Sequence, residues 1–184
     1  MYVASSPRGY INAFEIDGST GMLTPVPGSP FNIPVASDCR GNSAGPNDVI
    51  DNAGKYIYTA DRFIDSISGF DIGSNGALTS IAGSPWSDEG GCDVPPSCDS
   101  CVSKPSSLAI DGTGKFLYGD NSDIEEIAIY SIGANGALSF VKTTGTSVGC
   151  VGPIRADATG KLPLHGVLRG ECSERLSRPR RFLY

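Results

Sequence analysis

The sequence predicts an all-β protein built from repeated four-stranded antiparallel sheets, and three observations lead to this prediction. The 184 residues include 24 glycines and 13 prolines, which indicates many tight turns. Short segments rich in Val, Ile, Thr and Tyr alternate in polarity as half-buried strands do. Two sequence motifs also recur along the chain at intervals of between 46 and 60 residues, the length of one small sheet and its loops.

The first recurring motif forms the second half of each repeat, at residues 14–31, 70–86 and 130–141. An alternating strand leads into a Gly-containing turn, which in the last two copies contains Asn-Gly, a sequence typical of hairpins. The first two copies end in Gly-Ser-Pro followed by Phe31 or Trp86. We expect these two rings to pack at the edge of a sheet and not to stack on a ligand.

The second motif lies between these copies and supplies the first half of the next repeat. It begins at Pro46, Pro105 and Pro153 and continues through a short strand to the pattern Asp-x-x-Gly-Lys. In the first two copies an aromatic strand follows, so each complete unit contains four strands. These strands carry apolar residues on both faces, which a sheet requires when it is stacked between two others, as in a β-propeller.

The repeats cover residues 1–161 and predict a partial β-propeller of four-stranded antiparallel blades. Residues 1–26 supply the last three strands of one blade, 46–83 and 105–142 form two full blades, and 153–158 supply the first strand of a fourth. Propellers typically have about four to eight blades. We therefore expect either a piece of a larger propeller, with Met1 at an internal strand position, or self-association through the open blade edges.

Residues 162–184 depart from the repeat pattern. They contain five Arg and two Glu, a net charge of +3, and the predicted strand does not resume after Lys161. We interpret this segment as an atypical basic tail, from a replaced or frame-shifted terminus or a disordered end.

Charge and hydropathy exclude two classes of partner. Lys and Arg number 14 against 20 Asp and Glu, so the net charge of −6 disfavours nucleic acid. No apolar run approaches the roughly 20 residues that a membrane-spanning helix needs. The expected partner is a small molecule or another protein surface.

The two motifs together resemble those of lactonase-type seven-bladed β-propellers, the family that includes 6-phosphogluconolactonases. The resemblance rests on Leu-Thr-x-Val/Ile-x-Gly-Ser-Pro-Phe/Trp and on Ile-Asp-x-x-Gly-Lys-x-x-Tyr, and it covers roughly residues 1–161. It implies a carboxylic ester hydrolase that opens a sugar lactone of the 6-phosphogluconolactone type without a cofactor. No family catalytic residue is assignable, since the single histidine, His165, lies in the tail. The alternative is a non-catalytic extracytoplasmic propeller that serves as a binding scaffold for a glycan, peptide or protein.

The candidate ligand site lies on one rim of the predicted propeller. Within each blade, the turn between the first and second strands and the turn between the third and fourth strands are short. The loops between the second and third strands and between blades are long, and long loops carry ligand sites. The candidate ligand-binding residues on that rim are Arg40, Asp61, Arg62, Asp120, Asn121 and Arg155. The arginines suit a phosphate or carboxylate, although solvated loop charges are the alternative.

Two further patterns on these loops do not predict a catalytic or metal site. Ser43 lies in a Gly-x-Ser-x-Gly pattern, but without the strand-turn-helix context that a nucleophile of this type needs. The acidic stretch 120–126 lacks the ligand spacing of a calcium loop, so no metal site is predicted.

Five cysteines fall in the loops between blades, and Cys172 lies in the tail. Cys98 and Cys101 form a Cys-x-x-Cys pair, but no second pair accompanies it, which weighs against zinc. Disulfides are the favoured interpretation, with the pairing open, and they indicate an oxidising extracytoplasmic compartment, the cytoplasm being the alternative. The candidate disulfide cysteines are Cys39, Cys92, Cys98, Cys101 and Cys150.

Overall fold

The structure is a computed structural model that describes residues 1–5, 9–33, 48–50, 53–61, 66–87, 105–121, 126–145 and 154–155. These residues contain strands and turns and no helix, and therefore no helix able to cross a membrane. The strands are β1 (Tyr2–Ser5), β2 (Tyr10–Ile16), β3 (Leu23–Pro25), β4 (Phe31–Asn32), β5 (Asp48–Ile50), β6 (Tyr56–Asp61), β7 (Ser66–Ile72), β8 (Leu78–Ser80), β9 (Trp86–Ser87), β10 (Pro105–Ile110), β11 (Phe116–Asn121), β12 (Glu126–Ile132) and β13 (Leu138–Gly145).

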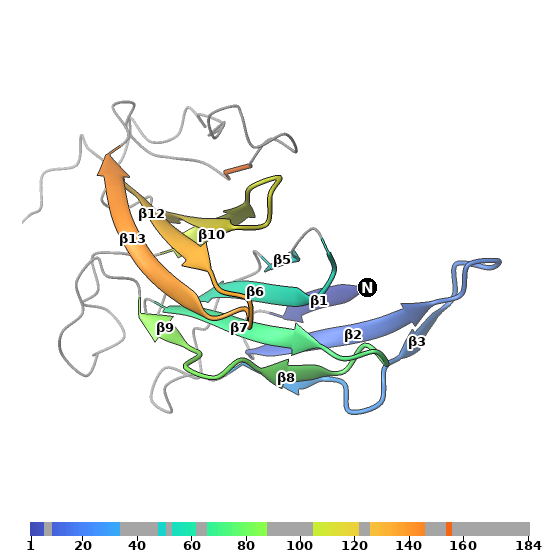
Figure 1. The fold of residues 1–184 in the computed structure, drawn as a ribbon. Coiled ribbons are helices and arrows are strands. Elements are labelled where there is room, and N and C mark those ends of the chain that lie inside the picture. The colour runs from blue at the N-terminus through green and yellow to red at the C-terminus, as the bar shows by residue number, and fades with distance from the viewer. Residues whose placement is uncertain are drawn as a thin grey trace, which may run out of the picture.

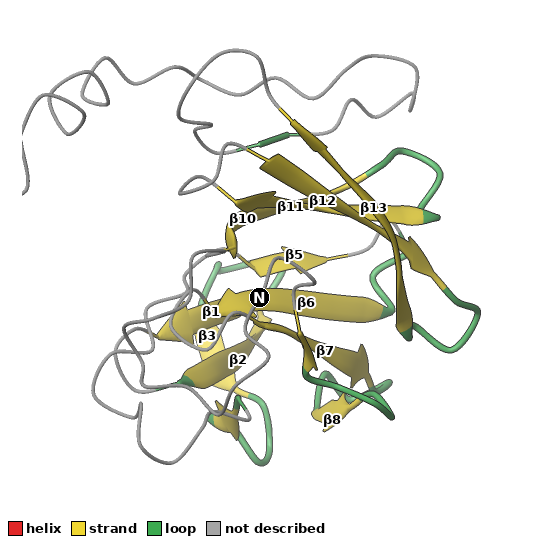
Figure 2. Cartoon of the chain, turned by 90° about the vertical axis from the view of Figure 1, so that its left-hand side faces the viewer, coloured by secondary structure: helices red, strands yellow, loops and turns green. Residues whose placement is uncertain are grey.

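The strands form three antiparallel sheets that follow one another in chain order (Figure 1). The first sheet has the order β1-β2-β3, with β4 also paired to β2. The second has the order β5-β6-β7-β8, with β9 paired to β7, and the third has the order β10-β11-β12-β13. Figure 2 shows the sheets side by side, as the blades of a propeller are. The predicted all-β fold of four-stranded antiparallel blades is confirmed.

The Gly-Ser-Pro motif interrupts the outermost strand of the first two sheets. After Ile81 the backbone leaves β7 through the cis peptide between Ser84 and Pro85, and it rejoins β7 at Trp86. The hydroxyl of Ser84 takes the place of a backbone acceptor, because its Oγ accepts the Gly69 N–H at 2.9 Å. Blades one and two therefore extend past the motif to residues 32 and 87, beyond the predicted ends at 26 and 83.

The first sheet repeats this arrangement, and the third does not. Ser29 Oγ accepts the Ala13 N–H at 3.0 Å, also next to a cis Ser-Pro bond. The third copy lacks Gly-Ser-Pro, so β13 runs unbroken over eight residues, with one register irregularity opposite Ile129 and Tyr130.

Two apolar cores lie between the sheets. The core between the first and second sheets contains Ile11, Ile33, Ile57, Phe70 and Leu78. The core between the second and third sheets is larger, and its most deeply buried large side chains come from the middle strands: Tyr58, Ile67, Leu117 and Tyr130. Apolar residues on both faces of the second sheet are therefore packed against a neighbouring sheet, as the repeat pattern predicts.

A tyrosine of β1 and a tyrosine of β6 bind the first and second sheets, each to the hairpin of the sheet that follows. The Tyr2 hydroxyl donates to the Gly76 carbonyl oxygen at 2.9 Å, and the Tyr58 hydroxyl donates to the Gly136 carbonyl oxygen at 2.8 Å. Both glycines have a φ of +78° in Asn-Gly turns. The aligned tyrosine and Asn-Gly of the repeat thus form one contact between consecutive blades.

The Asp-Gly-Thr-Gly turn of the third sheet is closed by the Asp111 carboxylate. Oδ1 accepts the N–H groups of Lys115 and Phe116, both at 2.9 Å, and Oδ2 accepts the N–H and hydroxyl of Thr113. Burial opposes the charged form of Asp111, but these hydrogen bonds outweigh it and hold the pKa of the carboxyl below its usual value.

Candidate functional site

Three of the predicted ligand-binding residues end the second strands of the second and third sheets. Asp61 and Asn121 are the last residues of β6 and β11 and occupy equivalent positions in the repeat. Both are buried, and so is Asp120. Because successive strand residues point to opposite faces, Asn121 lies on the face that carries Leu117, and Asp120 lies on the other. Neither aspartate is a solvated loop charge.

Small polar side chains accompany Asp61 at this end of the second sheet. The strand register sets Asp61 opposite Ser66 and Thr59 opposite Ser68, and all four are buried. The Ser66 and Ser68 hydroxyls lack a hydrogen-bond partner among the described residues, as do both side-chain polar atoms of Asn121. A buried polar atom without a partner costs about 1–3 kcal/mol, so such atoms are uncommon outside functional sites. This end of the two sheets therefore has the hydrogen-bonding capacity to hold a polyhydroxylated ligand.

Arg155 is the remaining predicted site residue within the described part of the chain. It is exposed, next to the buried Ile154, whose N–H donates to Ser107 Oγ at 3.1 Å. Within the described ranges no three His, Cys, Asp or Glu side chains gather where they would hold a metal ion. The predicted residues that lie outside the described part of the chain are Arg40, Arg62, Ser43, His165 and all six cysteines.

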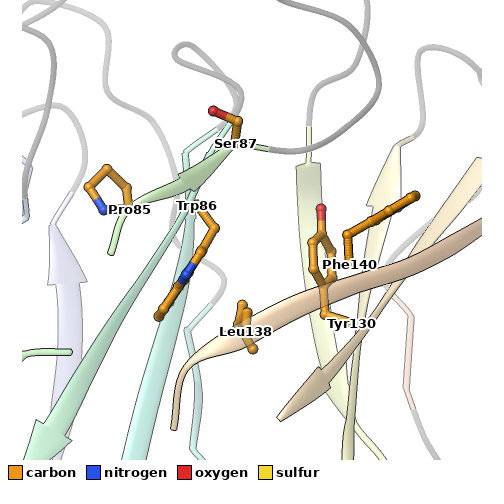
Figure 3. Close-up of a pocket in the computed structure, with 6 residues that line it drawn as sticks. All are labelled: Pro85, Trp86, Ser87, Tyr130, Leu138 and Phe140. Atoms are coloured by element: carbon orange, nitrogen blue, oxygen red, sulfur yellow. The ribbon is translucent and has the colours of Figure 1, made fainter. Parts of the chain in front are cut away.

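A second candidate site is an aromatic cleft that the sequence reasoning missed. It lies between the second and third sheets, and Figure 3 shows Trp86 of β9 on one wall, Tyr130 and Phe140 on the other, and Leu138 between them. The cavity volume is about 340 Å³, and Pro85 and Ser87 complete the lining. The rings of Tyr130 and Phe140 meet edge to face, with centroids 5.8 Å apart.

The cleft exists because the third copy of the repeat differs from the first two. Phe140 occupies the position of Pro25 and Ser80, and it pairs with Tyr130 across β12 and β13. Its ring is 39% exposed and extends the wall beyond the buried Tyr130. Trp86 packs on the core, with its ring centroid 6.5 Å from that of Tyr58, as predicted, and it also faces the cleft. The substitution of Phe for Ser at one aligned position was the available signal.

Comparison with known proteins places the fold. No protein-family model matches the chain, and no curated protein matches it. Among solved structures, a "putative 6-phosphogluconolactonase" from Bacteroides uniformis has a TM-score of 0.63 at 21% identity, covering 91% of this chain and 49% of that one. The periplasmic gluconolactonase of Pseudomonas aeruginosa has a TM-score of 0.57 at 14% identity, covering 78% and 35%.

A propeller of a different kind is similar to the same degree. The β-propeller domain of Cps50 (Swd1) from Myceliophteria thermophila has a TM-score of 0.57 at 14% identity, covering 85% of this chain and 43% of that one. The chain thus spans less than half the length of each of these three structures. At these identities the likeness establishes the fold alone, a partial β-propeller.

Proposed function

We propose that the chain forms blades of a lactonase-type β-propeller that opens a sugar lactone at the polar end of β6 and β11. The observation that carries the proposal is the buried polar set at that end. It contains two carboxylates, Asp61 and Asp120, and Ser and Asn side chains that have no hydrogen-bond partner among the described residues. The sequence motifs and the two lactonase-like structural neighbours support the same substrate class. The periplasmic neighbour and the cysteine-rich loops favour an extracytoplasmic location.

The proposed reaction requires a base, a site for the sugar hydroxyls, and water. A carboxylate of Asp61 or Asp120 accepts a proton from a water molecule whose oxygen attacks the lactone carbonyl carbon. The ring C–O bond then breaks, and the proton returns to the departing alkoxide, so that the product is the open hydroxy acid. Ser66, Ser68 and Asn121 supply hydroxyl and amide groups for the sugar hydroxyls.

The test is the initial rate of hydrolysis of 6-phosphogluconolactone and of glucono-1,5-lactone by the 184-residue chain, against a buffer blank. We expect Asp61→Asn or Asp120→Asn to lower the enzymatic rate by about 10²-fold or more, as the loss of a base does. Asp17→Asn is the matched control, because Asp17 lies in an exposed turn of the first sheet. A chain that unfolds cooperatively and yet hydrolyses both lactones no faster than buffer would contradict the proposal.

The aromatic cleft favours a second candidate function, a binding scaffold for a glycan. Flat aromatic side chains on two walls with a few polar groups suit a sugar ring. Trp86 is the single tryptophan of the chain, so its fluorescence reports on this cleft directly. We expect an oligosaccharide to shift the emission of the wild type and of Val141→Ala but not of Phe140→Ala. A panel of glycans that leaves the wild-type emission unchanged would contradict this function.

A further inference from the structure

Repeat positions that are buried between the sheets are exposed at the two ends of the stack. The aligned residues Leu78 and Leu138 are 8% and 6% exposed, whereas Leu23 of the first sheet is 45% exposed. Tyr56 is 6% exposed against the third sheet, whereas the aligned Phe116 is 38% exposed. Each end of the stack therefore presents a surface that the molecule buries elsewhere.

The two end surfaces are opposite halves of one kind of interface. The leading face of the first sheet consists of Met1, Val3, Ile16 and Leu23, and it aligns with the faces that the second and third sheets turn toward their predecessors. The trailing face of the third sheet consists of Phe116, Tyr118, Ile129 and Val141, and it aligns with the faces turned toward the next sheet.

One tyrosine hydroxyl, that of Tyr118, and one glycine turn, at Gly21, take no part in the tyrosine contact between the described sheets. Tyr118 is the third copy of Tyr2 and Tyr58, and the described residues contain no sheet after the third whose hairpin could accept its hydroxyl. Gly21 is the third copy of Gly76 and Gly136, with a φ of +72° at the leading face. Partial burial and the charge of Asp111 raise the pKa of Tyr118 from its ordinary value.

Among the described residues, the first sheet has no counterpart of the inner strand with which the other two sheets begin. The second and third sheets begin with an inner strand, β5 or β10, whereas the first sheet begins with β1, which aligns with β6 and β11. Ile154 and Arg155 align with Leu108 and Ala109 of β10, yet in this structure they belong to no strand. Ser107 Oγ accepts the Ile154 N–H at 3.1 Å, which holds this segment next to β10.

We propose that two copies of the chain associate head to tail, each trailing face packing on the leading face of the other. In this arrangement Ile154 and Arg155 of one copy add the inner strand to the first sheet of the other copy. The pairs Leu108–Gly119 and Ala109–Tyr118 set the register, which places Ile154 opposite Val3 and Arg155 opposite Tyr2. The seam occurs twice and joins two sets of three blades into one ring, a blade number within the usual range of about four to eight.

The first measurement is the mass of the wild-type chain in solution by light scattering and sedimentation, with the expectation of a dimer. Leu23→Glu and Phe116→Glu each place a charge on one face of every seam, and we expect both proteins to be monomeric. Ala53→Glu is the matched control, because Ala53 lies exposed in a turn of the second sheet and on neither face. A wild type that is monomeric and unfolds cooperatively would overturn the proposal.

Mixing the two variants distinguishes a head-to-tail dimer from any other. The Leu23→Glu chain keeps an intact trailing face and the Phe116→Glu chain an intact leading face, so we expect an equimolar mixture to form a heterodimer through one seam. A face-to-face dimer gives no such rescue, and its absence would overturn the proposal. Tyr118→Phe is a milder variant that keeps the fold and removes one hydroxyl. We expect it to weaken the dimer by about 25-fold to 100-fold, because the dimer loses this hydrogen bond at both seams and one such bond is worth about five-fold to ten-fold.

Discussion

The hairpin glycine Gly136 offers a direct measure of the contact between blades. A Cβ built at Gly136 would lie 2.7 Å from two ring carbons of Tyr56 and 2.8 Å from Cδ1 of Ile81, both in the second sheet. No Cβ contact is that short, so Gly136→Ala must push the third sheet's hairpin away from the second sheet. The Tyr58 hydroxyl bond to the Gly136 carbonyl oxygen is then lengthened or lost.

Two terms make up the expected loss of stability. An alanine at a φ of +78° costs about 1–2 kcal/mol, because its Cβ approaches the carbonyl oxygen. Overpacking of a buried contact adds about 1–3 kcal/mol. We therefore expect Gly136→Ala to lower the free energy of unfolding by about 2–5 kcal/mol. The matched control is Gly54→Ala, at a φ of +67° with no atom within 4 Å of the added Cβ, and it isolates the first term.

Urea unfolding followed by the fluorescence of the single tryptophan, Trp86, is the assay. The difference between the two variants measures the sheet-to-sheet contact, and the shared backbone cost cancels. Equal losses for Gly136→Ala and Gly54→Ala would refute the reasoning, since the hairpin would then not press on the second sheet.

Three further predictions concern single contacts. Ser84→Ala removes the acceptor of the Gly69 N–H, and urea unfolding should show a loss of about 1–2 kcal/mol; an unchanged midpoint would mean that the hydroxyl is dispensable. Asp111 stabilises the folded state at pH values above about 4, the carboxyl pKa of the unfolded chain, because the pKa of this carboxyl is lower in the folded state. The contribution disappears as the pH falls through the folded pKa. Thermal melts should therefore show less acid sensitivity in Asp111→Asn. Gly69→Ala puts a Cβ 2.7 Å from Cζ3 of Trp86. Trp86→Phe should restore part of the lost stability, measured by circular dichroism, because the first sheet has Ala13 and Phe31 at the two aligned positions.

The repeat predicts the sheets because each strand is specified locally. Alternation sets the faces, Asn-Gly and Asp-x-x-Gly set the turns, and the aligned copies set the order. The contacts between sheets are less local and were not foreseen. Nothing within one copy shows that Tyr58 reaches Gly136, because the two residues are 78 positions apart. The predicted blade ends at residues 26 and 83 are too early for the same reason, since the Ser hydroxyl of Gly-Ser-Pro accepts a hydrogen bond from a different strand of the sheet.

At the candidate site, too, the sequence predicts local features but not the contacts with neighbouring sheets. The repeat pattern predicts Asp61, Asp120 and Asn121 on the rim loop that follows their strands, whereas in the structure they are the final residues of β6 and β11. Their burial does not follow, because it depends on what the neighbouring sheets and loops bring to that end. Solvated loop charges are the alternative for the arginines of the rim, and Arg155, the one of them within the described residues, is exposed.

Differences between copies carry the information that the repeat itself cannot. At most aligned positions the three copies keep the same kind of residue, because each packs against an equivalent neighbour. Asp120 stands where the first two copies have Ala4 and Ala60, and Phe140 stands where they have Pro25 and Ser80. A buried carboxylate costs stability that an alanine does not, and a half-exposed phenylalanine leaves apolar surface in water. Asp120 does not improve the packing of its sheet, and Phe140 meets Tyr130 edge to face but leaves much of its own surface exposed. The first substitution lies in the candidate polar site, and the second forms a wall of the aromatic cleft. Packing accounts for the residues that the copies share, and these two departures are the positions where a ligand is the better explanation.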